Sequence, residues 1–411
     1  YSDLYASPSS ASQPSPLASQ RMELGPQGHR YPFPVYASLP LNAPGSLSKV
    51  KRLIIVVHDE RRDARRSLRA VAALYAGQAG PKADTLIVAP RFPSMVDASL
   101  QGMPAWRRTG WMEGLPSIAA RDRPPPISSF RILDDLLRHF TAPGRLPALQ
   151  TLVLAGHGAG AQMVQRYAVL NPLDESLRAT GLDLTYVVAN AESYLYLSPL
   201  RPSRTGRGYT RYERGICPTY EHYRYGLEDL PAVLQNYDGR LSRIQLATRY
   251  AQRRVTYLLG SADTNPEYAG LDKGCGAEAE GATPLARGLG YWGYEMRARA
   301  KYAPKPAHRG FIVQDIGHSE TEIYASACAA RALLGDGNWT TTATCTPASP
   351  GPFPLGTTHV DCFAIDSHGN RGAAPFNITV RATTAPTVTV PSGVSVDATG
   401  PKGAVVTFDV Q

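Results

Sequence analysis

The segment 151–171, TLVLAGHGAGAQMVQRYAVLN, constrains the fold more than any other part of this sequence, because two different periodicities meet in it. Residues 152–155 are continuously apolar, which is typical of a strand buried on both faces of a parallel sheet. The small residues that follow can continue neither a strand nor a helix, and the stretch after them has the spacing of an amphipathic helix. The segment therefore predicts a strand, a tight turn and a helix in direct succession.

Apolar, β-branched runs recur along the chain and alternate with stretches of helical periodicity. The runs that predict further strands are 50–59, 85–92, 184–197, 254–263 and 310–319, and the helical stretches are 67–79 and 128–140. Such alternation predicts an α/β fold, with a doubly wound, mostly parallel sheet and helices on both faces. We expect residues 21–334 to form this domain.

The tight turn has the form in which many hydrolases carry a nucleophilic serine. That form is G-x-S-x-G between a strand and a helix, with small residues flanking the centre because the helix packs close to the strand. Gly156 and Gly160 meet this need, but the central residue is Gly158. Glycine suits strained backbone, so the turn can persist without its nucleophile. We therefore predict that the chain cannot perform serine hydrolysis.

The other members of such a site can be sought in the chain order acid, then histidine. Asp263 follows the strand-like run TYLLG, and His318 follows FIVQDIG. The oxyanion-binding region is expected at His58 and Asp59, after the first buried strand, together with Ala159, the residue after the elbow centre.

On these motifs, residues 30–330 resemble a group of secreted bacterial α/β-hydrolases of the esterase and lipase type. The matching segments are IIVVH, AGH-x-AGAQ-x-VQRYA, VVAN-x-x-SYLYL, LLGSAD and GHS. The resemblance implies an α/β-hydrolase fold. It places Asp263 as the acid of a catalytic triad and His318 as its base, with Gly158 in the position of the nucleophile.

The chain departs from this group at three further positions. Asp59 stands where the group usually has glycine, and Ala191 and Glu192 replace the usual small, proline or serine residues. Two explanations of Gly158 stay open, an engineered Ser→Gly substitution and a natural loss of the nucleophile. The neighbouring departures favour the natural loss, in which Asp263 and His318 are remnants.

From residue 339 the texture changes to Thr- and Val-rich runs broken by Pro and Gly, which predicts a small immunoglobulin-like β-sandwich. Residues 343–381 resemble the second half of a HYR module, an immunoglobulin-like repeat of extracellular and adhesive proteins, through C-x-P-x-S, FPLGTT-x-V-x-C and A-x-D-x-x-GN. Residues 385–411 resemble its first half through PTVTVP and ATGP-x-GAVV-x-F. The halves stand in reversed order, so we divide this part into 335–384 and 385–411.

Either half alone would leave sheet edges unpaired and a core open. Residues 385–411 could fold back on their own chain as a circular permutation, or begin a second module. They could instead complete the half-module 339–381 of a neighbouring chain, and such head-to-tail addition builds open filaments when the rotation does not close.

The cysteines favour an oxidising, extracellular location. None of the five forms a C-x-x-C pair, so we expect disulfides, no metal ion and no cofactor. Cys345 with Cys362 is the first expected pair and Cys217 with Cys275 the second, which leaves Cys328.

The net charge of +9 raises the question of nucleic-acid binding, but the arginines are scattered and no nucleic-acid motif accompanies them. We therefore expect no nucleic-acid partner. No apolar run reaches the length of a membrane span. Residues 1–20, rich in Ser, Pro and Ala, predict an extended or disordered arm.

The leading functional hypothesis is an inactive, hydrolase-like extracellular structural protein that associates with itself through residues 385–411 and 339–381. The alternative is a secreted serine esterase, lipase or polyester hydrolase present as an inactive Ser→Gly variant. A third hypothesis keeps the pocket as a binding site for an acyl ester or a glycan, without turnover.

Overall fold

The computed structural model describes residues 19–43, 45–74, 84–97, 100–204, 208–302, 308–335, 343–347, 352–365, 371–382 and 389–408. The chain divides into two compact units, Tyr1–Thr341 with Ile365–Gly372, and Thr342–Ala364 with Ala373–Gln411. The predicted arm 1–20 lies outside the described residues except for Ser19 and Gln20, which already belong to the first strand.

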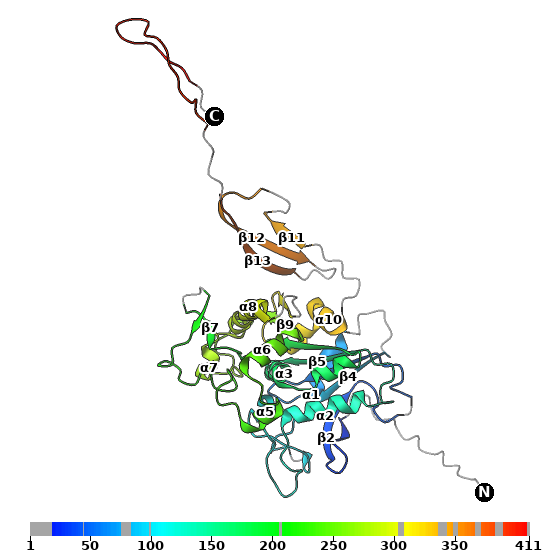
Figure 1. Cartoon of the computed structure of the whole chain (residues 1–411). Helices are drawn as coiled ribbons and strands as arrows, with labels where there is room; N and C mark the ends of the chain where they lie inside the picture. The colour runs from blue at the N-terminus through cyan, green and yellow to red at the C-terminus, as the bar shows by residue number, and fades with distance from the viewer. Residues whose placement is uncertain are drawn as a thin grey trace, which may run out of the picture. The chain divides into compact units, whose positions relative to one another are not determined.

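A mostly parallel sheet forms the centre of the first unit (Figure 1). Its eight strands have the order β1-β2-β4-β3-β5-β6-β9-β10. The strands are β1 (Ser19–Leu24), β2 (Tyr31–Ala37), β3 (Arg52–Val57), β4 (Thr85–Pro90), β5 (Thr151–His157), β6 (Asp183–Ala189), β9 (Arg254–Gly260) and β10 (His308–Val313). Neighbouring strands in the series β4-β3-β5-β6-β9-β10 pair in parallel. At the other edge, β2 pairs antiparallel with both β1 and β4.

Strand β3 shows why the central strands are apolar throughout. Leu53, Ile55 and Val57 belong to one hydrophobic cluster, and Ile54 and Val56 belong to a second one. Successive side chains of a strand point to opposite faces, so each face of the sheet needs its own apolar cover. The predicted doubly covered sheet is confirmed.

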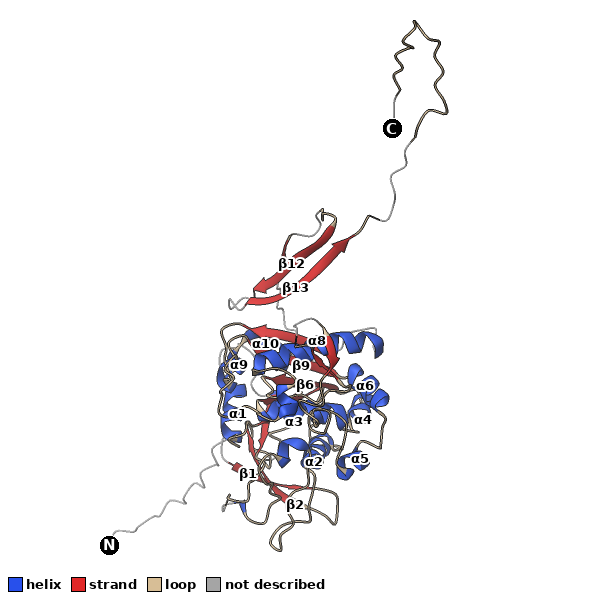
Figure 2. Ribbon diagram, turned by 90° about the vertical axis from the view of Figure 1, so that its left-hand side faces the viewer, coloured by secondary structure: helices blue, strands red, loops and turns tan. Residues whose placement is uncertain are grey.

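Helices cover both faces of this sheet. One face carries α2 (Ser129–Thr141), α3 (Ala159–Leu170), α4 (Asp174–Ala179), α5 (Ala232–Tyr237), α6 (Arg243–Gln252) and α8 (Pro284–Tyr302). The other face carries α1 (Ala64–Ala73), α9 (Glu320–Ala325) and α10 (Ala327–Leu334). In Figure 2, α1 and α9 lie to the left of the sheet and α4 and α6 to the right. Among the described residues, no helix combines the length and apolarity that crossing a bilayer requires.

The strand predicted over 184–197 ends at Ala189, so its second half is a correction. Asn190 adopts a positive φ of 46°, its side-chain oxygen accepts the N–H of Gly260, and its Nδ2 donates to the carbonyl of Gly317. This bend turns the chain out of the sheet. Tyr194 then stacks on Tyr291 with ring centroids 4.6 Å apart, so the apolar run reflects tyrosine packing and not strand pairing.

The predicted disulfide Cys217–Cys275 is confirmed. It links the long segment between β6 and β9 to the segment that follows β9. Cys217 packs with Tyr220 and Ala279 in a small cluster apart from the main cores. The short elements of the first unit are the 3-10 helix η3 (Gly110–Glu113), β7 (Leu200–Pro202), β8 (Tyr209–Arg211) and α7 (Cys275–Glu278). Cys328 lies half-buried in α10.

The second unit contains an antiparallel sheet of β11 (Ala343–Thr346), β12 (Gly356–Ile365) and β13 (Arg371–Val380). The backbones of Cys345 and Cys362 are register partners, and Cys362 is disulfide-bonded, as the predicted pairing requires. Residues 389–408 contain no strand and are exposed almost throughout. The described part of the second unit thus contains one three-stranded sheet and an exposed segment without strands, while the two-sheet sandwich stays a prediction.

Candidate functional site

Five loops converge at the carboxyl edge of the central sheet. Because β3, β5, β6, β9 and β10 run parallel, their carboxyl ends meet at one edge, where open α/β sheets place their sites. Asp59 follows β3, Gly158 follows β5, Glu192 follows β6, Asp263 follows β9 and His318 follows β10. The predicted site residues are therefore brought together from distant parts of the chain.

The turn between β5 and α3 has the tight backbone that the sequence predicts. Gly158 caps α3 with φ 53° and ψ −117°, a conformation that strains any residue with a side chain. A Cβ on Gly160 would lie 2.3 Å from the carbonyl oxygen of Val57, and one on Gly156 would lie 2.3 Å from the carbonyl carbon of Gly160. The flanking glycines are thus required by the close approach of helix and strands.

Asp263 and His318 form a hydrogen-bonded pair beside this turn. Oδ2 of Asp263 lies 2.8 Å from Nδ1 of His318, and both side chains are buried. The carboxylate accepts from Nδ1–H, so Nε2 carries the free lone pair and faces the turn. A Cβ on Gly158 would lie 3.1 Å from this Nε2. The geometry is that of an acid and a histidine arranged around an empty third position.

The carboxylate of Asp59 takes the space next to that position. Its Oδ1 accepts the backbone N–H of Ala159 at 3.0 Å and that of Glu60 at 2.8 Å. A Cβ on Gly158 would lie only 2.4 Å from this oxygen, closer than real Cβ contacts allow. The N–H group of Ala159, which is expected to bind an oxyanion, therefore already donates to a carboxylate. An aspartate at position 59 leaves no room for a side chain at position 158, so the two departures are sterically linked.

His58 lies in the loop where the oxyanion-binding region is predicted, and its side chain belongs to the core. Its Nε2 accepts the N–H of Phe92 at 3.0 Å, its Nδ1 lies 2.8 Å from the carbonyl oxygen of Asp59, and its ring lies 4.6 Å from that of Trp111. Burial lowers the pKa of His58 to about 4, so the ring is neutral. The side chain fixes the end of β3 and does not face the site.

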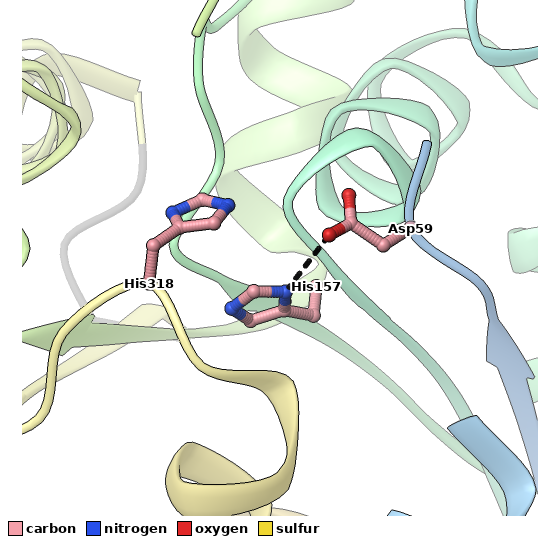
Figure 3. A group of neighbouring side chains, drawn as sticks. All are labelled: Asp59, His157 and His318. Atoms are coloured by element: carbon pink, nitrogen blue, oxygen red, sulfur yellow. Dashed lines mark ion pairs between the residues drawn. The ribbon is translucent and has the colours of Figure 1, made fainter. Parts of the chain in front are cut away.

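His157 is a site residue that the sequence did not single out (Figure 3). Its Nδ1 lies 3.7 Å from Oδ2 of Asp59, beyond hydrogen-bonding distance, and its ring centroid lies 4.7 Å from that of His318. The side chain is buried, and burial lowers the pKa of His157. The sequence gives only a weak signal for His157, because this residue occupies the variable second position of the pattern G-x-S-x-G.

Glu192 was noticed only as a departure from the resembled group, and it proves to face His318. Its Oε1 lies 3.7 Å from Nε2 of His318, and its Oε2 accepts from Nε2 of Gln162 at 3.2 Å. Burial, followed by the repulsion of Asp59 and Glu60, raises the pKa of Glu192 to about 9, so this carboxyl is protonated at neutral pH.

Asp59, in contrast, is ionised at neutral pH. Burial alone would raise its pKa, but the imidazole of His157, the N–H of Ala159 and His318 more than offset burial and hold the pKa of Asp59 well below its usual range. In addition to the pair formed by Asp263 and His318, the edge of the sheet therefore presents the carboxylate of Asp59, the imidazole of His157 and the neutral carboxyl of Glu192.

The cavity at this edge is small. It encloses about 90 Å³ and is lined by Asp59, Arg61, Asp63, Arg66, Tyr268, His318 and Glu320. Pockets for small-molecule ligands usually enclose about 300–1,000 Å³. A larger cavity of about 670 Å³, around Arg30 and Asp135, contains none of the predicted site residues. The cavity at the edge thus suits water or an ion better than an acyl chain.

No protein-family model matches the chain, and no curated protein sequence matches it. Among solved structures, it is similar to the poly(3-hydroxybutyrate) depolymerase LpqC from Bordetella parapertussis, with 17% identity over 76% of this chain and 89% of that chain and a TM-score of 0.52. It also matches poly(aspartic acid) hydrolase-1 from Sphingomonas sp. KT-1, with 22% identity over 76% of this chain and 97% of that one and a TM-score of 0.49. The likeness to the depolymerase, together with the mostly parallel sheet and its flanking helices, shows that the first unit has the α/β-hydrolase fold.

Proposed function

We propose that this chain is an extracellular structural protein that retains a hydrolase fold without serine hydrolysis and that assembles through its C-terminal residues. The disulfide Cys217–Cys275 supports an oxidising location, because such bonds persist outside the reducing cytosol.

The observation that carries the loss of serine chemistry is the place of the Asp59 carboxylate. It accepts the N–H of Ala159, and its Oδ1 would lie 2.4 Å from any Cβ at position 158. Oxyanion stabilisation depends on donors that are free to meet developing negative charge, and removing one such donor costs about 10²–10³ in rate. A fixed carboxylate on the donor repels that charge as well, so both the nucleophile and its electrostatic support are missing.

Assembly is supported by the exposed apolar residues of 389–408. Val405 is 94% exposed and Phe408 65% exposed, and in this segment no residue pairs in a strand. The sheet β11–β12–β13 has two edges, and an extended segment can add to such an edge through main-chain hydrogen bonds while its alternate side chains fill a core. Among the arrangements that the sequence leaves open, we favour addition of residues 385–411 to the sheet of another copy. This arrangement uses both the exposed apolar side chains and the sheet edges.

The test is the mass of the purified chain by light scattering, with and without residues 385–411. We expect the full chain to form concentration-dependent assemblies, seen as filaments by electron microscopy, and the shortened chain to stay monomeric. A synthetic peptide of residues 385–411 is expected to bind the shortened chain at one copy per chain. A full chain that stays monomeric over the whole concentration range would overturn the proposal.

Hydrolysis is the second candidate, favoured by the intact hydrogen bond between Asp263 and His318. A chain with residual esterase activity should hydrolyse a p-nitrophenyl ester faster than its His318→Ala variant does. We expect the two rates to be equal. Binding of acyl esters or glycans without turnover is tested by calorimetry on the same samples, and the cavity of about 90 Å³ argues against it.

A further inference from the structure

Two histidines and an aspartate meet at the place where a nucleophile would stand. Asp59, His157 and His318 each offer one ligand atom, and these atoms all lie within 4.8 Å of one another. They come from the ends of β3, β5 and β10, so a rigid sheet edge sets their spacing. Two imidazoles and a carboxylate form a donor set typical of zinc and related divalent transition metals, and not of calcium or magnesium.

Asp59 and His318 are held by hydrogen bonds that leave one ligand atom of each directed at the cluster. Oδ1 of Asp59 accepts hydrogen bonds from the N–H groups of Ala159 and Glu60. Oδ2 of Asp59 is left to face Nδ1 of His157 at 3.7 Å. The carboxylate of Asp263 binds Nδ1 of His318 at 2.8 Å, which leaves Nε2 free. A carboxylate behind a ligating histidine is the arrangement that fixes tautomer and orientation in metal sites.

Three of the four imidazole nitrogens in this cluster lack hydrogen-bond partners. Within the part of the chain that the structure describes, neither nitrogen of His157 nor Nε2 of His318 has one. His157 is only 1% exposed, so solvent does not supply the missing bond. Such buried polar atoms are rare, because each costs free energy unless a partner or an ion satisfies it.

The glycine at position 158 makes room for an ion. A Cβ there would lie 3.1 Å from Nε2 of His318 and 2.4 Å from Oδ1 of Asp59, so a side chain would fill the space between the histidine and the carboxylate. The cavity of about 90 Å³, lined in part by Asp59 and His318, opens the cluster to solvent and gives an ion a route inward.

We propose that Asp59, His157 and His318 bind one divalent transition-metal ion, with Zn²⁺ as the best match, in the space left by the missing nucleophile side chain. Tetrahedral coordination of zinc places ligand atoms about 3.3 Å apart, so the three residues close in by small side-chain movements. Oε1 of Glu192, buried and 3.7 Å from Nε2 of His318, is positioned to hold a water molecule bound to the ion.

The test uses the untagged full chain, because a histidine tag binds the same metals. After the chain is stripped with chelator and dialysed against Zn²⁺, we expect one equivalent of zinc by elemental analysis. Co²⁺, used as a spectroscopic probe, is expected to give the intense visible absorption of a tetrahedral site and to be displaced by Zn²⁺. No bound zinc beyond the level of a metal-free control protein would overturn the proposal.

Variants assign the site. Asp59→Asn and His318→Gln are each expected to weaken zinc affinity roughly tenfold or more and to abolish the Co²⁺ band. Glu60→Gln is the matched control, because this neighbouring carboxylate is exposed and outside the cluster, and it should bind as the unchanged chain does. Unchanged binding by both cluster variants would place the zinc elsewhere.

If a cluster variant fails to fold, Gly158→Ser provides an independent test. All three ligand residues are kept, but a Cβ at position 158 would lie 2.4 Å from Oδ1 of Asp59, so the serine displaces this carboxylate and fills the space for the ion. It is expected to lower the zinc affinity and to lose the rise in unfolding temperature that zinc gives the unchanged chain. A Gly158→Ser chain that binds zinc with full affinity would contradict the placement of the ion.

Discussion

The two units of this chain treat their apolar side chains in opposite ways. In the first unit, the strands of the central sheet are buried on both faces beneath two layers of helices. In the second unit, Val405 and Phe408 of the last described segment remain largely exposed. The first unit therefore completes its own core, whereas the second carries exposed apolar surface of the kind that often marks an interaction site. This contrast is the basis on which we propose association through the C-terminal unit.

The largest expected effect follows from changing the apolar side chains through which we propose that the chain associates. Apolar and polar side chains alternate over residues 406–410, so Val406 and Phe408 share one face of an extended segment. The double substitution Val406→Asp/Phe408→Asp puts two charges into the core that this face would enter. We expect assembly to fall by orders of magnitude, measured by light scattering.

The matched control is Ser392→Asp/Ser395→Asp, which adds the same charge at exposed polar positions of the same segment. This control should assemble as the unchanged chain does. Equal loss of assembly in both double variants would point to charge repulsion and remove the role given to the apolar face.

The second prediction concerns ester hydrolysis at the carboxyl edge of the central sheet. Gly158→Ser alone is expected to stay inactive, because the carboxylate of Asp59 lies where the serine must stand. Asp59→Gly/Gly158→Ser frees both the space and the N–H of Ala159, so we expect hydrolysis of p-nitrophenyl acetate at least about 100-fold above the single variant. Adding His318→Ala should remove the gain, and equal rates for single and double variants would show that Asp59 is not the block.

The same edge shows how far sequence reasoning reaches. Gly158, Asp263 and His318 could be located because each follows a recognisable strand and the order of such residues is regular. His157 and Glu192 could not, because their roles depend on how closely the ends of β5, β6 and β10 approach, which no local pattern encodes.

The misassigned strand has a local physical cause. The apolar run 184–197 predicts one strand, but Asn190 bends the chain after Ala189 and the following tyrosines pack on Tyr291. Tertiary contacts thus decide a boundary that the local sequence pattern does not encode.

The third prediction compares the disulfide of the first unit with the predicted pair Cys345–Cys362 of the second unit. Cys217→Ser/Cys275→Ser removes a bond that closes a loop with a sequence separation of 58, beside a small satellite cluster. We expect the first unit to lose about 2–4 kcal/mol in its free energy of unfolding, measured by urea denaturation. Cys345→Ser/Cys362→Ser should leave that transition unchanged, and a shared loss would show that the two units unfold together.

The smallest expected effect concerns Glu280, a buried carboxyl of the self-sufficient first unit. Its Oε2 accepts the N–H of Tyr194 at 2.9 Å, and burial raises the pKa of Glu280 to about 8, although Arg201 and Arg287 oppose the shift. Between the ordinary pKa of a glutamate and pH 8, Glu280 therefore keeps its proton in the folded chain and has lost it in the unfolded chain. Stability from this group is complete below that ordinary value and is lost as pH rises toward 8.

Glu280→Gln keeps the acceptor for Tyr194 and removes the titration. Between pH 6 and pH 7, the unchanged chain should lose about 1 kcal/mol of unfolding free energy relative to this variant, measured by urea denaturation at both values. Glu278→Gln, an exposed neighbour in α7, should follow the unchanged chain. If Glu280→Gln instead parallels the unchanged chain across this interval, the carboxyl is already ionised in the folded state, and the first unit holds a buried charge that its arginines stabilise.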